Sequence, residues 1–447
     1  MTALDSRPDI PRRAVLAVGA GAPVATLALA GCSDDDPGTD REVGQPDLLA
    51  DGGRVDPGAA AGAGQLAVPF SSRLLGALDR SEVNLICSPL SAQVALTMAG
   101  LGAAGDTRAQ LEEVLGGSID ELAATANTLS SVLEAVGDDE REEADEDAPE
   151  PAVASLVDGA WLQEGLAVQE EFLSGLKTHL GTGVYEVDFT DQEEREKGRE
   201  RINDWVSDAT GDLIEELIPE SALSDATRMV LVNALHLKAA WSNSLSTTGG
   251  TFTTSAGEEV SAEMLTGGTS SWYEDDLCRA TSVDTYGDDL ALALVQPVED
   301  LASVLDAWAD AADDGASGLA ALLAGLESSD AATEVTLPGF DIEWGDSLKH
   351  VLQGLGMEDP FTDAADFSGI TAQEQLMITD VLQKAVITVD EDGMEAAAAT
   401  GVIADTTSAQ TGQHELILDS PFLVVAYERT TQAPLVAGWI GDPTQTR

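Results

Sequence analysis

The chain has 447 residues, of which 81 are acidic and 21 are basic, giving a formal net charge of −60. This charge is spread along the whole chain and argues against a nucleic-acid-binding protein, because binding to phosphates needs a basic surface. Carboxylates that repel one another destabilise a fold at low ionic strength, so we expect an organism that lives in concentrated salt. Acidic runs such as residues 137–151 are then expected to be solvated surface.

The N-terminus is typical of an export signal. Arg12 and Arg13 precede an apolar stretch, residues 14–30, which is too short for a spanning helix. The paired arginines resemble a twin-arginine signal, and the stretch ends in Leu-Ala-Gly-Cys, which resembles a lipobox. We therefore expect residues 1–31 to be removed and Cys32 to carry a lipid anchor. The protein would then lie outside the cell, on the outer face of the cytoplasmic membrane.

Residues 32–64, which follow the signal in the sequence, are rich in Asp, Gly and Pro and lack periodicity. This composition predicts a disordered acidic tether. Residues 65–447 contain no linker and no visible repeat, which predicts one large domain. Only Cys87 and Cys278 follow Cys32, so no disulfide framework is expected. The sequence leaves open whether these two cysteines pair.

Within residues 65–447, helical and β periodicities alternate. Helices are predicted over Leu90–Gly100, Thr107–Leu115 and Arg201–Ile218. Strands are predicted over Met229–Leu237, Leu290–Pro297, Ala385–Val389 and Phe422–Tyr427. This mixture predicts an α+β fold with mostly antiparallel sheets.

Enzyme and metal motifs are incomplete in this sequence. Gly345–Leu348 spells the GDSL of some esterases, but it lies near the C-terminus and has no Asp-x-x-His downstream. Asp390–Gly393 resembles part of a calcium loop, yet the register puts Thr388 and Ala399 where an Asp and a Glu are needed. The four histidines have no spacing that suits zinc; they are His179, His236, His350 and His414. We expect no catalytic residue, no metal and no cofactor.

The stretch from Val389 to Ser408 reads VDEDGMEAAAATGVIADTTS. If it is placed as a strand, alternate residues face opposite sides. One face is uncharged and mostly small: Met394, Ala396, Ala398, Thr400, Val402 and Ala404. The other face carries the charges of Glu395 and Asp405. From Gly393 to Thr407 such a strand would span roughly 46 Å, unusually long, and its two faces suit a strand that slides between two others over a packed core.

This stretch resembles the reactive-centre hinge of the serpins, the serine protease inhibitor family. The hinge pattern of glutamate, glycine and small residues stands here as Glu391, Asp392, Gly393, Met394, Glu395, Ala396, Ala397, Ala398, Ala399 and Thr400. Two further motifs resemble serpin segments: Ser88-Pro89-Leu90-Ser91, and the run from Asn233 through Lys238 to Trp241. The C-terminal run SPFLVVAYERTTQAPLVAGWIGDP matches the family's last strands.

The resemblance implies a fold of three β-sheets with eight to nine helices and an exposed reactive-centre loop. It also implies a monomer that inhibits serine proteases as a suicide substrate, with insertion of the cleaved loop and covalent trapping of the acyl-enzyme. By the geometry that the resemblance implies, counting from Gly393 places the scissile bond at Thr407-Ser408. No basic residue lies between Lys384 and Arg429, which favours subtilisin-like or elastase- and chymotrypsin-like targets over trypsin-like ones.

The sequence departs from the family pattern at two positions. Gln383 stands where serpins often have a histidine that bonds the shutter region, which is formed here by Ser88, Ser91 and Asn233. An amide supplies both a donor and an acceptor, so the contact can survive. Met394 replaces the usual Thr or Ser at the first inserting position; it tolerates burial but could slow insertion.

Three other functions stay open. One is a non-inhibitory serpin that acts as a cell-surface binding or chaperone-like protein. The small residues at 396–399 argue against it, because non-inhibitory members often carry bulky or charged residues there. The second is a solute-binding lipoprotein, which the tether would equally suit, and the third is an esterase.

Overall fold

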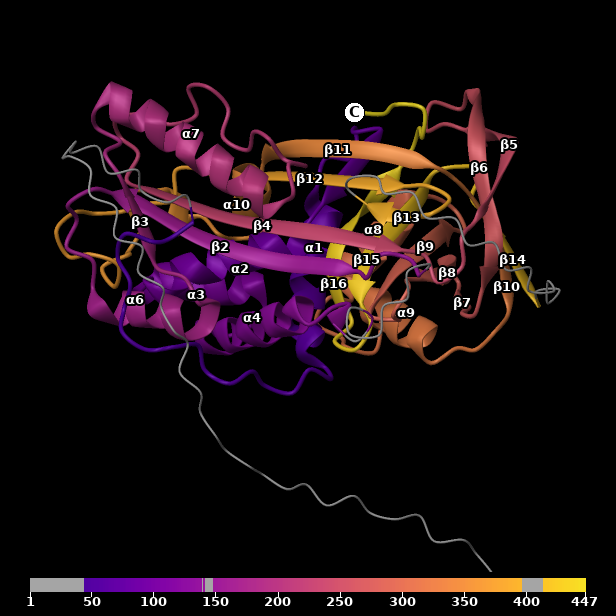
Figure 1. Cartoon of the computed structure of the whole chain (residues 1–447), viewed down its shortest axis with the longest axis horizontal. Helices are drawn as coiled ribbons and strands as arrows, with labels where there is room; N and C mark the ends of the chain where they lie inside the picture. Colours follow the sequence, from indigo (N-terminus) through magenta and orange to yellow (C-terminus); the bar gives the residue numbers. More distant parts are fainter. Residues whose placement is uncertain (1–43, 139, 141–147, 396–412) are drawn as a thin grey trace, which may run out of the picture. The chain divides into compact units, whose positions relative to one another are not determined.

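A computed structural model describes residues 44–138, 140, 148–395 and 413–447, without the side chain of residue 395 (Figure 1). The chain divides into two units, Met1–Glu42 and Val43–Arg447. The predicted signal peptide, the anchor Cys32, the hinge residues from Ala396 to Thr400 and the bond Thr407-Ser408 lie outside the described residues. In the described part of the chain, no helix is both long enough and apolar enough to cross a bilayer.

Three β-sheets organise the second unit. The first sheet has six strands in the spatial order β11 (Phe340–Ser347), β12 (Leu382–Val389), β13 (Gly393–Glu395), β4 (Met229–Ala240), β2 (Val153–Gln163) and β3 (Val184–Val187). The second has the order β1 (Asn84–Cys87), β16 (Ala433–Ile440), β15 (Phe422–Glu428), β9 (Leu290–Pro297), β8 (Cys278–Asp284) and β7 (Tyr273–Glu274). The third has the order β14 (His414–Ile417), β10 (Thr333–Pro338), β6 (Glu259–Thr269) and β5 (Ser246–Thr253).

Nine α-helices accompany the sheets in the described residues: α1 (Ala67–Ala77), α2 (Pro89–Leu101), α3 (Gly105–Leu115), α4 (Ile119–Glu134), α6 (Glu170–Gly175), α7 (Gln192–Ala209), α8 (Leu301–Asp310), α9 (Gly318–Glu327) and α10 (Lys349–Gly354). The predicted architecture of three sheets with eight to nine helices is confirmed. All four predicted strands and the first two predicted helices are present as β4, β9, β12, β15, α2 and α3.

The third predicted helix, Arg201–Ile218, is wrong at both ends, because α7 runs from Gln192 to Ala209. Asp191 caps α7 by accepting hydrogen bonds from the backbone of Glu193 and Glu194, and the helix ends at Ala209. Gly211 and Asp212 have positive φ angles of 60° and 66°, which stops a right-handed helix. Ile214 and Ile218 lie beyond these two residues and are buried without being helical. Their helix-like spacing therefore reflects packing of a loop against the domain and not a helix.

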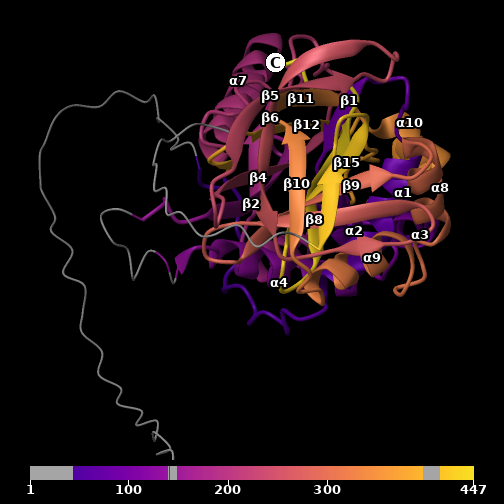
Figure 2. The same cartoon turned by 90° about the vertical axis from the view of Figure 1, so that its right-hand side faces the viewer.

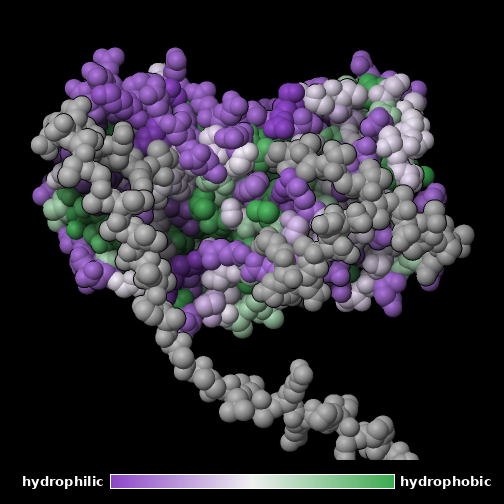
Figure 3. Space-filling model, viewed as in Figure 1, coloured by the Kyte–Doolittle hydropathy of each residue, from purple (hydrophilic) through white to green (hydrophobic). Residues whose placement is uncertain are grey.

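The first sheet is covered on both faces. α2 lies against one face and belongs with the inner residues of β2 and β4 to the main core. α7 lies across the opposite face, where Trp161 stacks on Tyr185 and Trp205 packs against both rings edge to face. Figure 1 and the turned view of Figure 2 both place α7 and α2 on opposite sides of β2 and β4. Hydrophilic side chains gather over α7 on the outer surface (Figure 3), as the acidic composition predicts.

Residues 44–64, the described part of the predicted tether, lie against the domain. Leu48 pairs with Val184 of the edge strand β3 through two backbone hydrogen bonds of 2.8 and 2.9 Å. Arg54 donates to Asn127 at 3.0 Å and forms an ion pair with Glu134 at 2.7 Å, both on α4. The edge of β3 presents free backbone groups that need partners, and this segment supplies them. Composition alone does not reveal such a contact.

Candidate functional site

The hinge residues next to β12 form a short strand, β13, between β12 and β4. Met394 lies opposite Val389 on one side and opposite Ala239 on the other. The Asp390 carboxylate accepts hydrogen bonds from the backbone N–H groups of Asp392 at 2.9 Å and Gly393 at 3.0 Å, which closes the turn into the strand. A Cβ at Gly393 would lie only 2.5 Å from the carbonyl oxygen of Ala239, so a glycine is required at this position.

Trp241 fixes the start of this hinge through two hydrogen bonds. Its backbone N–H donates to the carbonyl of Asp392, and its indole Nε1 donates to the carbonyl of Asp390, both at 2.9 Å. The backbone N–H of Leu245 donates to the carbonyl of Glu391 at 2.8 Å. Trp241 itself is only 2% exposed, so these donors act where water does not compete.

Met394 occupies the first inner position of the strand and is 1% exposed. Its thioether side chain belongs to the main core. A flexible apolar side chain fills an irregular space well, which explains how methionine serves where relatives have a small hydroxyl residue. The methionine therefore fits the buried position that it occupies in β13.

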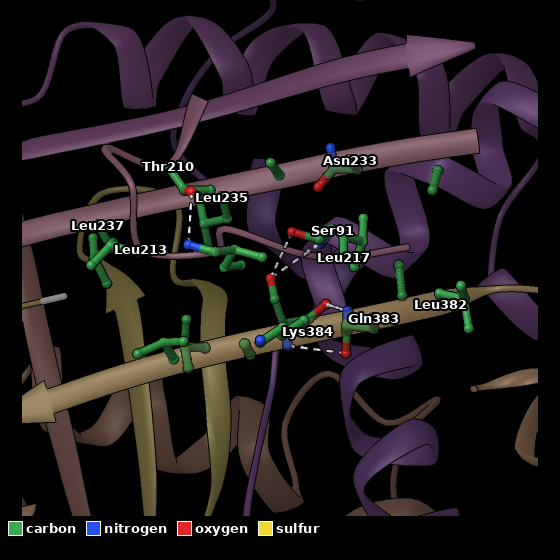
Figure 4. Close-up of a pocket in the computed structure, with 18 of the residues that line it drawn as sticks. Ser91, Thr210, Leu213, Leu217, Asn233, Leu235, Leu237, Leu382, Gln383 and Lys384 are labelled. Atoms are coloured by element: carbon green, nitrogen blue, oxygen red, sulfur yellow. Dashed lines mark hydrogen bonds between the residues drawn. The ribbon is translucent and has the colours of Figure 1, made fainter. Parts of the chain in front are cut away.

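Beyond β13, a slot separates β12 from β4. Among the described residues, β12 pairs with β11 and β13, and β4 pairs with β13 and β2. A cavity of about 60 Å³ lies between the two strands. Its walls include Leu231, Leu235 and Leu237 of β4 together with Leu382, Ala385 and Ile387 of β12, and its floor includes Ser88 and Ser91 (Figure 4). Residues from Thr210 to Leu217 border it on the α7 side.

The predicted shutter residues meet in this cavity. The Gln383 amide donates through Nε2 to the carbonyl of Ser88 at 2.6 Å and accepts through Oε1 from the N–H of Ser88 at 3.3 Å. The hydroxyls of Ser88 and Ser91 lie 2.8 Å apart, and Ser88 also donates to the carbonyl of Leu435 at 2.7 Å. Pro89 is the first residue of α2 and orients this corner. A glutamine thus supplies both the donor and the acceptor expected of it.

Asn233 lines the same cavity but bonds elsewhere. Its Nδ2 donates to a carboxylate oxygen of Asp158, which lies directly opposite it in the pairing of β2 with β4. Its Oδ1 is buried and has no hydrogen-bond partner. Asp158 was not among the predicted site residues. The only available signal was a single charge within the otherwise uncharged strand VASLVDGAWLQ.

Burial raises the pKa of Asp158 to about 7, although the hydrogen bond from Asn233 and the positive charge of Arg54 act in the opposite direction. Its side chain is 6% exposed. A carboxylate with a pKa near neutrality changes charge in the physiological range, which an ordinary aspartate does not.

The residues considered for other chemistry have these surroundings in the described part of the chain. Ser347 of the GDSL run lies on β11 and donates to Asp380, and its oxygen accepts from the N–H of Lys349. Among the described residues, no group of three or more His, Cys, Asp or Glu side chains is placed to hold a metal ion. Cys87 and Cys278 are both free and buried, and burial raises the pKa of both thiols far above the usual range.

Comparison with known proteins agrees with this arrangement. The family described as "Serpin (serine protease inhibitor)" matches residues 65–443. A "Serine protease inhibitor" of Cyanea capillata is 28% identical over 393 residues, covering 86% of this chain and 98% of that protein. The "Leukocyte elastase inhibitor" of Bos taurus is 28% identical over 378 residues, covering 80% of this chain and 93% of the relative.

Among solved structures, the thermophilic serpin tengpin in its native state superposes with a TM-score of 0.74 at 22% identity, covering 88% of this chain and 97% of that one. The structure titled "Cleaved Serpin 42Da" gives a TM-score of 0.69 at 25% identity, covering 85% and 98%. These two structures support the fold, and the family match covers most of the sequence. The chain belongs to the serpin family, a family of serine protease inhibitors rather than enzymes.

Proposed function

We propose that this protein inhibits serine proteases as a suicide substrate. The protease serine attacks the carbonyl carbon of Thr407, an ester forms between them, and the amine of Ser408 leaves with the C-terminal fragment. The freed segment from residue 396 onward then extends β13 between β12 and β4. The attached protease is carried away and distorted before water can hydrolyse the ester. Inhibition is a race between insertion and hydrolysis.

The observation that supports this proposal is the slot itself. β13 already separates β12 from β4, and beyond it both strands border a cavity, with no pairing of β12 to β4 among the described residues. A strand that fills the slot would gain backbone hydrogen bonds on both sides and would bury its uncharged face. Free energy that insertion would release on cleavage is therefore held in reserve in this proposal.

The target proposed is a subtilisin-like or an elastase- or chymotrypsin-like enzyme, because small uncharged residues flank Thr407. The mature chain is mixed with each class in molar salt and analysed on a denaturing gel. A covalent band at the summed mass is expected for an inhibitor. A cleaved chain with no such band would instead identify a non-inhibitory serpin. Mass spectrometry of the released fragment tests the bond, and a new terminus outside residues 406–410 would refute its assignment.

We also propose that the protein is a lipoprotein held at the cell surface through Cys32, in an organism that lives in concentrated salt. The lipobox-like run and the charge of −60 support this. Such a location lets the inhibitor protect surface proteins from secreted proteases. The variant Cys32→Ser should appear in the medium, and its retention in the membrane fraction would place the anchor elsewhere.

A further inference from the structure

The half-buried Asn233 lines the slot, the buried Asp158 lies behind it, and the fold leaves one buried polar atom of Asn233 without a partner. Asp158 of β2 and Asn233 of β4 face each other across one strand pair, on the inner side of the sheet. Asn233 uses its Nδ2 for the carboxylate and turns toward the cavity, where its buried Oδ1 has no partner (Figure 4). An unpaired buried acceptor is costly, so this atom is available to any donor that enters the slot.

The charge of Asp158 determines how the Asn233 amide is turned. An ionised carboxylate only accepts hydrogen bonds, so it holds the Nδ2 end of the amide and leaves Oδ1 toward the slot. A protonated Asp158 gains an O–H donor, which can bind Oδ1 and turn Nδ2 toward the slot instead. The same side chain then presents a donor in place of an acceptor.

Few other charges act on this pair. Arg54, which is held on α4 by Asn127 and Glu134, is the cation whose field reaches Asp158. α2 contributes no charged residue, and Asp158 is the only charge in β2. His236 and Lys238 of β4 alternate with Asn233 and so belong to the outer face. Lys384 of β12 borders the cavity, and its ammonium group forms an ion pair with Glu343 at 3.0 Å.

We infer that Asp158 is a positioning residue for strand insertion: its charge state decides which end of the Asn233 amide faces the slot, and insertion therefore depends on pH. This inference rests on the proposed function. Insertion also removes water from the cavity beside the pair, which raises the cost of keeping the carboxylate ionised. Burial raises the pKa of Asp158 to about 7. Insertion is therefore favoured as the pH falls through neutrality, because Asp158 becomes protonated there.

The test uses the intact mature chain in molar salt and a labelled synthetic peptide with the sequence of residues 396–407, which continues where β13 ends. Its annealing rate is measured between pH about 5.5 and about 8.5, a range that brackets neutrality. We expect the rate to rise roughly tenfold toward the acid end, and to change less than about twofold in the isosteric variant Asp158→Asn.

The matched control is Asp284→Asn. Asp284 is a half-buried carboxylate of β8 whose pKa is also raised by burial, with Arg429 acting against the shift, but it does not line the slot. This variant should keep the wild-type pH profile. The pKa of His236 is lowered by burial, so its protonation gives a separate, more acidic step that Asp158→Asn retains.

A second measurement follows the protonation of the Asp158 carboxyl group in the wild-type protein by difference infrared spectroscopy. The pH midpoint of this protonation should coincide with the pH midpoint of the annealing rate. The inference is overturned if Asp158→Asn keeps the wild-type profile, if Asp284→Asn abolishes it equally, or if the two midpoints differ by more than about one pH unit. A peptide that fails to anneal at every pH would instead refute the proposed insertion mechanism.

Discussion

The variant Ala398→Arg is expected to turn the inhibitor into a substrate. Continuing the register of β13 by three residues sets position 398 opposite Leu235 of β4 and Ala385 of β12. Both of these residues line the cavity of about 60 Å³, on the same inner face as the buried Met394. An arginine at this position would have to enter that apolar space with its charge unpaired.

The magnitude follows from the cost of an unpaired buried charge, which is about 3 to 5 kcal/mol. If only a third of this cost is present at the insertion barrier, about 1.4 kcal/mol, insertion slows about tenfold relative to hydrolysis of the acyl-enzyme. Folding should be unaffected, because the uncleaved chain does not require residue 398 to enter the slot. The protease should therefore cleave the variant at the same bond and be released active.

The assay is the stoichiometry of inhibition together with the denaturing gel, performed in molar salt. The matched variant is Ala397→Arg, whose register sets it opposite His236 and Val386 on the outer face. It should retain much more inhibition. Equal behaviour of the two variants would refute the argument that alternate residues of this segment enter the core.

Three further predictions concern stability and the hinge. Burial raises the pKa of Asp158 to about 7, well above the usual value of about 3.9 for an aspartate, so its contribution to stability is complete below that usual value and is lost as pH rises through about 7. Asp158→Asn should therefore raise the free energy of unfolding above the wild-type value by about 2 to 4 kcal/mol at alkaline pH, and by much less in acid. Urea denaturation measures both differences, and equal differences at the two pH values would contradict this prediction. Gly393→Val should displace β13, since its Cβ would lie 2.5 Å from the Ala239 carbonyl oxygen, and a gel should show cleavage without the covalent band. Lowering the salt from molar to millimolar should weaken both inhibition and thermal stability, because the charge of −60 is then unscreened, and unchanged unfolding in dilute buffer would argue against a halophilic surface.

Much of the fold follows from local patterns. The β-branched run of β12 and the alternating small residues behind it predict a strand and its continuation, and the structure begins that continuation at Gly393. The ends of α2 and α3 agree with their predicted bounds to within two residues, because caps and periodicity are local signals. Residues 214 and 218 misled the helix prediction, since burial against α7 can give a loop the spacing of a helix.

The sequence by itself determined the family and the uncharged face of the segment after Gly393. It also predicted the contact between Ser88 and Gln383. Each of these depends on the order of residues along the chain. Only the tertiary structure decided that residues 44–64 pack against β3 and α4, that Cys87 and Cys278 stay apart, and that Asp158 meets Asn233. Asp158 and Asn233 are far apart in sequence and are joined by strand register. Register is set by the burial of whole strands, which no short stretch of residues encodes.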